Sequence, residues 1–217
     1  MSNGEAVLVV GLGRFGSAVA ETLVTLHEEV LAIDSDRNLV QQWAGRLTHV
    51  VEVDSTNEEA MRQIGADQFS RAVVGIGDLE ASVLTTSLLA EFAVPRIWSK
   101  AITKQHGEIL RRVGATNVIF PEREMGQRLA HVVTGGMIDF IEFEDGWSLV
   151  ETRAPREAVG KTLRQAGLRS KYGVTVVCIK RVGQEFTYAT PDTLVHEGDL
   201  LIVAGKTEDT GRFAHIK

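Results

Sequence analysis

The sequence has 217 residues, enough for one large or two small domains, and its 44% hydrophobic and 24% charged residues are typical of a globular protein that buries a core. The formal net charge of −6 argues against nucleic acid as a partner, because nucleic-acid binding depends on Lys and Arg side chains that neutralise phosphates. The one cysteine, Cys178, excludes an internal disulfide and a cysteine-rich zinc site, and no apolar run approaches the roughly 20 residues of a membrane-spanning helix, so we expect a cytoplasmic protein.

The most informative segment lies near the start of the chain. An apolar run at residues 7–10 leads into the motif Gly-Leu-Gly-Arg-Phe-Gly at residues 11–16, and apolar residues at helical spacing follow. In a strand–turn–helix of this kind, Gly11 permits the tight turn, Gly13 lets the backbone approach a pyrophosphate, and Gly16 lets the helix pack closely on the strand. The N–H groups at the start of the helix, and the positive end of its dipole, would then face the phosphates.

A second feature supports a nucleotide site. The next apolar run, residues 30–33, ends on Asp34, roughly 20 residues beyond the last glycine, where an acid that binds ribose hydroxyls is expected. Asp34 would repel a 2′-phosphate, which disfavours NADP. The glycine motif and Asp34 together predict a nucleotide site, and they do not say which nucleotide it takes.

Apolar strands alternate with helical patterns through the first half of the chain. We expect further strands at residues 49–53, 72–76, 96–100 and 117–120, and helices at residues 57–64, 79–92 and 104–113. Continuous apolar strands alternating with amphipathic helices are typical of a parallel sheet covered on both faces. About six such repeats make a complete doubly wound, Rossmann-like α/β domain, which we place at residues 1–121.

The pattern changes after Pro121. A helix is expected at residues 122–133, followed by two strand-like runs at 138–143 and 147–151 that flank Glu144-Asp145-Gly146, a β-hairpin signal. Further strands are expected at residues 173–180 and 200–204, with a turn at 182–184. We therefore predict a crossover helix and linker at residues 122–147 and a small α+β domain at residues 148–217.

Two classes of function fit a nucleotide fold. An NAD-dependent oxidoreductase needs a proton donor beside the cofactor, and neither Tyr172 nor Tyr188 begins a Tyr-x-x-x-Lys pattern. A nucleotide sensor needs no such group. We therefore favour a nucleotide sensor that is not an enzyme. NAD-dependent oxidation, or sensing of NAD or NADH, is the alternative.

Three charged residues bear on the sensor hypothesis. A guanidinium at Arg14, inside the glycine motif, has the geometry to meet a terminal phosphate or to reach a neighbour's ligand across a dimer interface; the alternative is a solvated side chain at a helix start. Lys100 ends a strand at the sheet edge where doubly wound folds bind ligands, so it offers a second phosphate contact. Asp78, which follows Gly77 at another strand end, either faces that edge or caps the helix that begins near Leu79.

These residues also carry a family resemblance. Residues 9–16, together with Ala32-Ile33-Asp34 and Asp36, resemble the N-terminal domain of RCK proteins (regulators of potassium conductance), and especially the cytosolic gating subunits of bacterial Ktr/Trk potassium transporters. Further similar blocks span residues 53–56, 97–101, 121–126, 168–174 and 197–203, so the resemblance covers nearly the whole chain.

The resemblance implies a regulatory subunit that forms dimers, assembled into a ring, expected to be an octamer, beneath a separate membrane potassium-translocating subunit. ATP and ADP would bind the glycine loop and favour different ring shapes. The nucleotide-binding residues implied are Gly11, Gly13, Arg14, Phe15, Gly16, Asp34, Ser35, Asp36, Asp54, Ser55, Thr56, Gly77, Asp78 and Lys100. Asp34 and Asp36 would hold the ribose, residues 54–56 would lie near the base, and Arg14 and Lys100 would contact phosphate.

The resemblance implies two further ligands. Glu122 corresponds to an acid that binds a divalent cation, Mg²⁺ or Ca²⁺, between subunits, whereas by itself it is equally a first-turn acid favoured by the helix dipole. Some relatives bind cyclic di-AMP in the C-terminal domain, and the corresponding residues are Arg169, Lys171, Val176 and Pro191. The same Arg-Ser-Lys-Tyr-Gly segment is equally compatible with a plain exposed turn.

Overall fold

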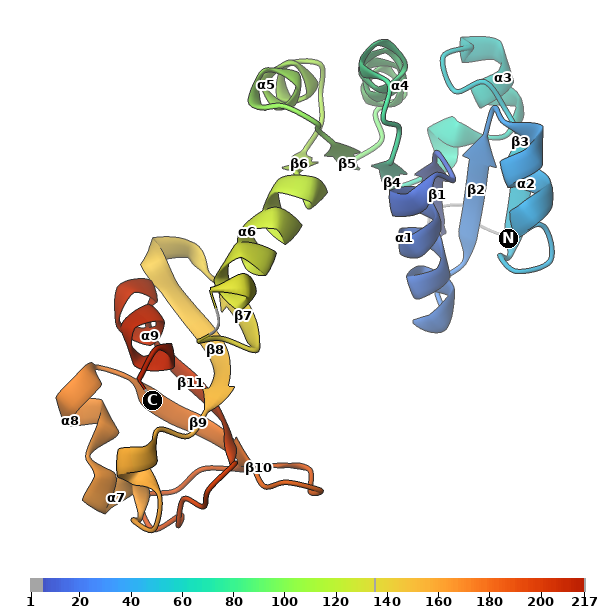
Figure 1. Cartoon of the computed structure of the whole chain (residues 1–217). Coiled ribbons are helices and arrows are strands. Elements are labelled where there is room, and N and C mark those ends of the chain that lie inside the picture. The colour runs from blue at the N-terminus through green and yellow to red at the C-terminus, as the bar shows by residue number, and fades with distance from the viewer. Residues whose placement is uncertain (1–5, 135, 217) are drawn as a thin grey trace. The chain divides into compact units, whose positions relative to one another are not determined.

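The computed structural model describes residues 6–134 and 136–216, and the chain divides between Glu122 and Arg123 into two compact units (Figure 1). The strands of the first unit are β1 (Val7–Val10), β2 (Val30–Asp34), β3 (His49–Glu52), β4 (Arg71–Val74), β5 (Arg96–Lys100) and β6 (Asn117–Ile119). Its helices are α1 (Arg14–Thr25), α2 (Arg37–Trp43), α3 (Glu58–Gln63), η1 (Ala66–Gln68), α4 (Leu79–Glu91) and α5 (Lys104–Arg112). Helix α6 (Pro121–Val133) begins at the end of this unit and continues into the next.

The six strands pair in parallel in the order β3-β2-β1-β4-β5-β6. This is the strand order of a doubly wound dinucleotide-binding fold, whose ligands bind at the carboxyl ends of the strands where the order reverses. The reversal lies at β1, between β2 and β4. The predicted Rossmann-like fold is confirmed, and the site is expected at the carboxyl edge of β1, β2 and β4.

The central strands of the sheet are buried on both faces. Alternate residues of β1 enter different hydrophobic clusters: Leu8 and Val10 pack in one with residues of α3 and α4, while Val7 and Val9 pack in the other with residues of α1 and α2. A strand covered on both sides cannot alternate apolar and polar residues, so it has a continuous apolar sequence. This explains why the runs at 7–10, 30–33 and 72–74 could be recognised as strands.

Helix α2 of the first unit was not predicted, and neither was the single turn η1. The α2 helix has seven residues and begins after Asp36, whose side chain accepts a hydrogen bond from the Asn38 N–H at 2.8 Å. The carboxylate satisfies one of the donors that a helix leaves unpaired at its start. Trp43, at the other end of α2, is buried in the cluster on this face of the sheet.

The second unit is an antiparallel sheet with short helices. Its strands are β7 (Asp139–Glu142), β8 (Trp147–Arg153), β9 (Thr175–Lys180), β10 (Phe186–Tyr188) and β11 (Leu200–Lys206), paired in the order β10-β9-β11-β8-β7. Its helices are α7 (Leu163–Ala166), α8 (Leu168–Tyr172) and α9 (Thr207–Ala214), with single turns η2 (Glu144–Gly146) and η3 (Arg156–Ala158). Its core includes Phe140, Val150, Leu201, Val203 and Phe213.

The predicted α+β character and the β-hairpin are confirmed. Strands β7 and β8 pair antiparallel around η2, where Asp145 and Gly146 both adopt positive φ. The stretch 122–147, expected as helix and linker, thus contains an edge strand of the second sheet. The strand β10 and the helices α7, α8 and α9 were not anticipated. Within the described residues, no helix has both the length and the apolar character needed to cross a membrane.

Candidate functional site

The glycine loop after β1 is shaped by contacts that leave no room for side chains. Gly11 has φ of +93°, a backbone region that disfavours side chains. A Cβ at Gly16 would lie 1.8 Å from the Gly11 carbonyl oxygen, and a Cβ at Gly75, after β4, would lie 3.2 Å from the Gly16 Cα. Two glycines at strand ends and one in the first turn of α1 therefore pack backbone against backbone. Gly75 was not singled out from the sequence, although a glycine directly after a buried strand is a signal for close approach.

Gly13 differs from its neighbours because it faces open space. A Cβ built there meets no atom within 4 Å, and its φ of −62° suits any residue. Gly13 is the N-cap of α1, no side chain caps this helix, and its first turn contains no acid. Uncapped N–H groups and the positive end of the helix dipole thus border an open region, an arrangement that suits an anion.

Asp34 is held against the glycine loop. Its Oδ2 accepts a hydrogen bond from the Leu12 N–H at 2.6 Å, and its Oδ1 accepts one from the Asp36 N–H at 2.8 Å. Each carboxylate oxygen has further lone pairs, so the group can still accept bonds from a diol. Asp34 lies at the end of β2, beside the loop, in the position that a ribose-binding acid requires.

Two other expected acids cap helices. The Asp36 carboxylate caps α2, and Asp78 Oδ1 accepts a hydrogen bond from the Ala81 N–H at 2.8 Å as the N-cap of α4. Of the two roles considered for Asp78, the structure therefore displays the cap. Ser35 and Gly77 are exposed at the same edge of the sheet.

The loop at residues 54–56 follows β3 at this edge. Asp54 Oδ1 accepts hydrogen bonds from the Thr56 N–H at 2.9 Å and the Thr56 hydroxyl at 2.7 Å, and these bonds lower the pKa of the Asp54 carboxyl. Both residues are exposed. Ser55 is different: its side chain is buried, and its hydroxyl lies 2.8 Å from that of Thr85 in α4. The Ser55 hydroxyl thus faces the interior and not the open edge.

The expected phosphate-binding residues lie near one another. Lys100 Nζ is 2.5 Å from Glu122 Oε1 and 5.9 Å from the centre of the Phe15 ring. The Lys100 side chain is 12% exposed and that of Glu122 is 65% exposed. The hydrogen bond from Lys100, with a smaller contribution from the charge of Arg14, lowers the pKa of the Glu122 carboxyl. Residues from α1, β5 and the start of α6 therefore form one charged cluster.

The described part of one chain does not contain a complete metal site. Among the described residues, no three His, Cys, Asp or Glu side chains lie close enough together to hold a metal ion. Glu122 supplies one carboxylate, and Lys100 already engages it. A divalent cation prefers six or more oxygen ligands, so Glu122 would need carboxylates or phosphates from elsewhere.

The second unit contains a pocket of about 340 Å³ between α7, α8, β9 and the loop that follows β10. Three of the four expected residues line it: Arg169, Val176 and Pro191. Lys171 does not. It lines another pocket, with Tyr172 and Asp209, and its Nζ lies 3.3 Å from Glu157 Oε2.

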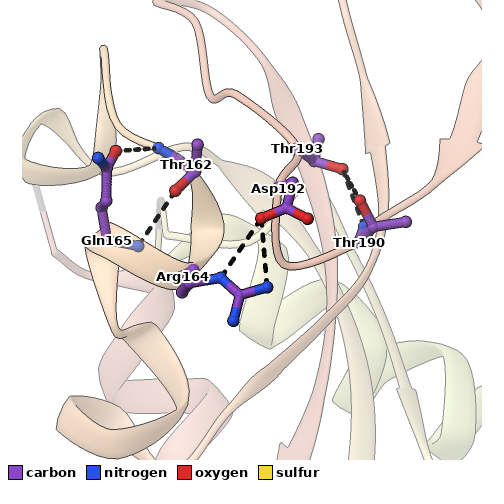
Figure 2. Close-up of polar contacts among 6 residues, drawn as sticks. All are labelled: Thr162, Arg164, Gln165, Thr190, Asp192 and Thr193. Atoms are coloured by element: carbon purple, nitrogen blue, oxygen red, sulfur yellow. Dashed lines mark hydrogen bonds and ion pairs between the residues drawn. The ribbon is translucent and has the colours of Figure 1, made fainter.

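The rim of this pocket is held by polar contacts that the sequence analysis missed. Figure 2 shows Arg164, which lines the pocket, pointing toward Asp192, with an ion-pair distance of 3.2 Å. Thr162 and Gln165 form a capping box at the start of α7, and the Thr190 N–H donates to the Thr193 hydroxyl at 2.8 Å. The Thr-x-x-Gln pattern is a known helix-start signal and was available in the sequence.

Comparisons with known proteins agree with this architecture. Residues 7–121 match the TrkA-N domain family and residues 149–217 match the TrkA-C domain family. Ktr system potassium uptake protein C of Bacillus subtilis (strain 168) is 37% identical over 207 residues, which cover 94% of each chain. This chain belongs to the TrkA-N/TrkA-C family. Ktr system potassium uptake protein A of the same strain is 35% identical over 207 residues, covering 94% of this chain and 93% of that protein.

Solved structures show the same fold. The chain aligns with the GsuK RCK domain with a TM-score of 0.71 and 16% identity, covering 98% of this chain and 47% of that one, so it spans about half of the GsuK chain. A second similar structure is described as the GsuK channel bound to NAD; it has a TM-score of 0.53 and 24% identity, and the alignment covers 96% of this chain and 38% of that one. A third is described as GsuK bound to ADP; it has a TM-score of 0.54 and 14% identity, and the alignment covers 59% of this chain and 34% of that one. The resemblance to RCK proteins of potassium transport is confirmed.

Proposed function

We propose that this protein is a non-enzymatic regulatory subunit of a bacterial potassium transport system, and that it senses ATP and ADP at the carboxyl edge of its parallel sheet. The observation that carries the proposal is Asp34, held by the Leu12 N–H beside an uncapped helix N-terminus. A carboxylate for the ribose and free N–H groups for the phosphates are the two parts that a nucleotide requires. The Ktr relatives supply the connection to potassium uptake.

We assign roles to the other residues according to their places at this edge of the sheet. Gly11, Gly16 and Gly75 give the loop its shape, and Gly13 leaves space for phosphate. We assign Asp54 and Thr56 to the ribose and base side, and Arg14 and Lys100 to the phosphate side. Because Lys100 is paired with Glu122, a phosphate bound at Lys100 must share the ammonium group with that carboxylate or displace it.

We assign residues 1–121 to the nucleotide-binding domain, 122–147 to the crossover segment and 148–217 to the C-terminal domain. The partner is a membrane potassium-translocating subunit, and the protein acts at the inner face of the membrane through it. Copies of this chain form dimers that assemble into a ring, which we expect to be an octamer. At a dimer interface, two Glu122 carboxylates together with phosphate oxygens would supply ligands for Mg²⁺ or Ca²⁺.

Calorimetric titration with ADP and ATP tests the nucleotide site. Asp34→Ala removes the carboxylate, and losing a charge-assisted hydrogen bond costs about 1.5–3 kcal/mol, so both nucleotides should bind at least tenfold more weakly. Asp34→Asn is a milder variant, because its amide oxygen can still accept the Leu12 N–H, although its amide nitrogen cannot accept the Asp36 N–H. It should disturb the loop less than Asp34→Ala does and still lose affinity. Unchanged affinity in Asp34→Ala would remove the basis of the proposal.

NAD or NADH is the alternative ligand, because Asp34 also suits the adenosine ribose of a dinucleotide. NADH titrated into the same protein distinguishes the two classes: tighter binding of NADH than of ADP and ATP favours the alternative. We expect no turnover, since no proton donor accompanies the glycine loop in the sequence. Steady, enzyme-dependent oxidation of NADH with a panel of carbonyl substrates would show an oxidoreductase instead.

We further propose cyclic di-AMP as the ligand of the 340 Å³ pocket in the second unit. Arg169 supplies a cation for phosphate, and Val176 and Pro191 supply apolar cover for adenine. Lys171 lines a different pocket and makes a matched control. Arg169→Ala should weaken cyclic di-AMP binding and Lys171→Ala should leave it unchanged. Equal effects of both substitutions would argue against this pocket.

A further inference from the structure

Helix α4 carries two adjacent threonines that bond to different parts of the sheet edge. Thr85 and Thr86 are both completely buried. The Thr85 hydroxyl lies 2.8 Å from the Ser55 hydroxyl, and the Thr86 hydroxyl lies 2.9 Å from that of Ser99. One helix therefore makes the same kind of hydrogen bond to the loop after β3 and to strand β5.

The two partners are held very differently by the rest of the fold. Ser99 lies inside β5 and is paired on both sides, with Val74 of β4 and Val118 of β6. Ser55 lies beyond the end of β3, which is an edge strand. The loop is joined to β2 by the Val53 N–H, which donates to the Asp34 carbonyl at 2.9 Å, and Asp54 and Thr56 bond to each other. The Ser55–Thr85 bond ties this loop to α4 across 30 positions of sequence.

We infer that Thr85 is a positioning residue for the nucleotide site: its hydrogen bond to Ser55 fixes the loop that presents Asp54 and Thr56 to the nucleoside. The inference rests on the proposed function and concerns the ribose and base end of that site. A valine at position 85 would leave the Ser55 hydroxyl buried without its partner, which is costly. Turning Ser55 outward would relieve this cost, and the turn would displace Asp54 and Thr56 on either side of it.

Substitution of threonine by valine provides a controlled test, because both residues are β-branched and similar in size. We would measure binding of ADP and of inorganic tripolyphosphate, which lacks the nucleoside, to the parent, Thr85→Val and Thr86→Val. Thr86→Val is the matched control: it also removes a buried hydroxyl from α4, but its partner strand stays fixed by backbone pairing. We expect Thr85→Val to bind ADP roughly tenfold more weakly and tripolyphosphate unchanged. Thr86→Val should change neither.

Two further variants make the result specific. Thr85→Ser keeps the hydroxyl and should restore ADP affinity. Ser55→Ala removes the same bond from the loop side, so it tests the inference even if Thr85→Val does not fold. It should also weaken ADP and spare tripolyphosphate.

The inference is overturned if Thr85→Val and Ser55→Ala bind ADP as tightly as the parent does. It is equally overturned if they weaken ADP and tripolyphosphate by the same factor, because that result would indicate general destabilisation. A parent protein that binds no adenine nucleotide would overturn the proposed function itself, and with it this inference. The two failures are therefore distinguishable from the parent's titration alone.

Discussion

Gly13 and Gly16 lie three positions apart in one motif, yet the structure gives them different reasons to be glycine. A Cβ at Gly16 collides with the Gly11 carbonyl oxygen at 1.8 Å, whereas a Cβ at Gly13 meets nothing within 4 Å. The requirement at Gly16 is therefore internal to the fold. At Gly13 the fold itself has room for a side chain, so the requirement for glycine comes from a ligand that occupies the adjacent open space.

This difference predicts opposite behaviour for two alanine substitutions. Gly16→Ala should destabilise the first unit by about 3 kcal/mol or more, since overpacking against backbone cannot be relieved by a rotamer change. Gly13→Ala should change stability by less than about 1 kcal/mol, the usual cost of alanine in place of glycine at an N-cap, and should abolish ADP binding. Thermal unfolding and ADP titration of both variants check the prediction. Normal ADP binding by Gly13→Ala would show that the ligand does not approach α1.

We propose that Arg14 distinguishes ATP from ADP. It is exposed at the first position of α1, and its charge reaches Glu122. A cation at a helix N-terminus is not favoured by the helix dipole, so this arginine is not explained by helix stability. ATP offers it a third phosphate, the γ-phosphate, that ADP lacks, and a switch requires ligands that favour its two states by different free energies.

Arg14→Ala should therefore erase most of the difference between ATP and ADP in potassium flux through the reconstituted transporter, and it should not lower thermal stability. Arg37→Ala is the matched control, because Arg37 is also exposed at the first position of a helix, α2. It should leave the discrimination intact. If Arg14→Ala still separates the two nucleotides as the parent does, another residue reads the terminal phosphate.

At the scale of single elements, the strands were easier to predict than the helix starts. Continuous apolar runs such as Val7–Val10 have one interpretation in an α/β protein, and the structure agrees with them. Asp36 was assigned only to the ribose, although a carboxylate after a strand can also cap a helix. The resemblance favoured the ribose, and the seven-residue helix that Asp36 caps was overlooked. The Ser55–Thr85 bond was out of reach, since nothing in a sequence pairs two hydroxyls 30 positions apart.

Helices α4 and α5 are joined by a buried histidine, His106 of α5, that is not among the residues of the candidate nucleotide site. His106 Nε2 lies 2.8 Å from the Ser82 hydroxyl, which itself donates to the Leu79 carbonyl. The Ile102 N–H points at His106 Nδ1 at 3.4 Å. This arrangement suits a neutral ring with its proton on Nε2. Burial lowers the pKa of His106 below 6.5.

The lowered pKa makes folding depend on pH. Below pH 6.5 the unfolded chain binds a proton at His106 that the folded chain does not, so the free energy of unfolding falls as the pH drops below 6.5. Above pH 6.5 the contribution is complete. Urea unfolding between pH 7.5 and 5 measures the effect, and in His106→Gln the dependence in this window should be weaker. The carboxylates of Glu122, Asp139 and Glu157, which are in ion pairs, also have lowered pKa values, but they change the free energy of unfolding only below about pH 4.5. An equal slope in parent and variant would assign the pH dependence to other groups.

At the scale of the whole molecule, the sequence supported a two-part organisation but described the second part incompletely. The doubly wound domain repeats one strand–helix pattern, so the prediction of each element supports the prediction of the others. The second unit has short helices of four and five residues, α7 and α8, that begin or end at Gly167 and Gly173 in left-handed conformation. Helices this short have little periodicity, and their stability comes from packing around Leu168 and Phe213.

Each unit has its own hydrophobic core. The clusters around β1 and α4 draw on residues up to 120, and the cluster around β8 and β11 draws on residues from 137 onward. A ligand stabilises only the part of a protein whose folded state it binds. Calorimetric unfolding should therefore show two transitions, and ADP should move only the one that belongs to the first unit. At 100 times its dissociation constant the gain is about 2.7 kcal/mol, or roughly 10 °C for a domain of this size.

Trp43 and Trp98 lie in the first unit and Trp147 in the second, so a Trp147→Phe variant reports the first unit alone by fluorescence. The shift should persist in Trp147→Phe and disappear in Asp34→Ala. A single transition that ADP moves as a whole would mean that the two units unfold together, and the nucleotide site would then be coupled to the C-terminal domain through stability itself.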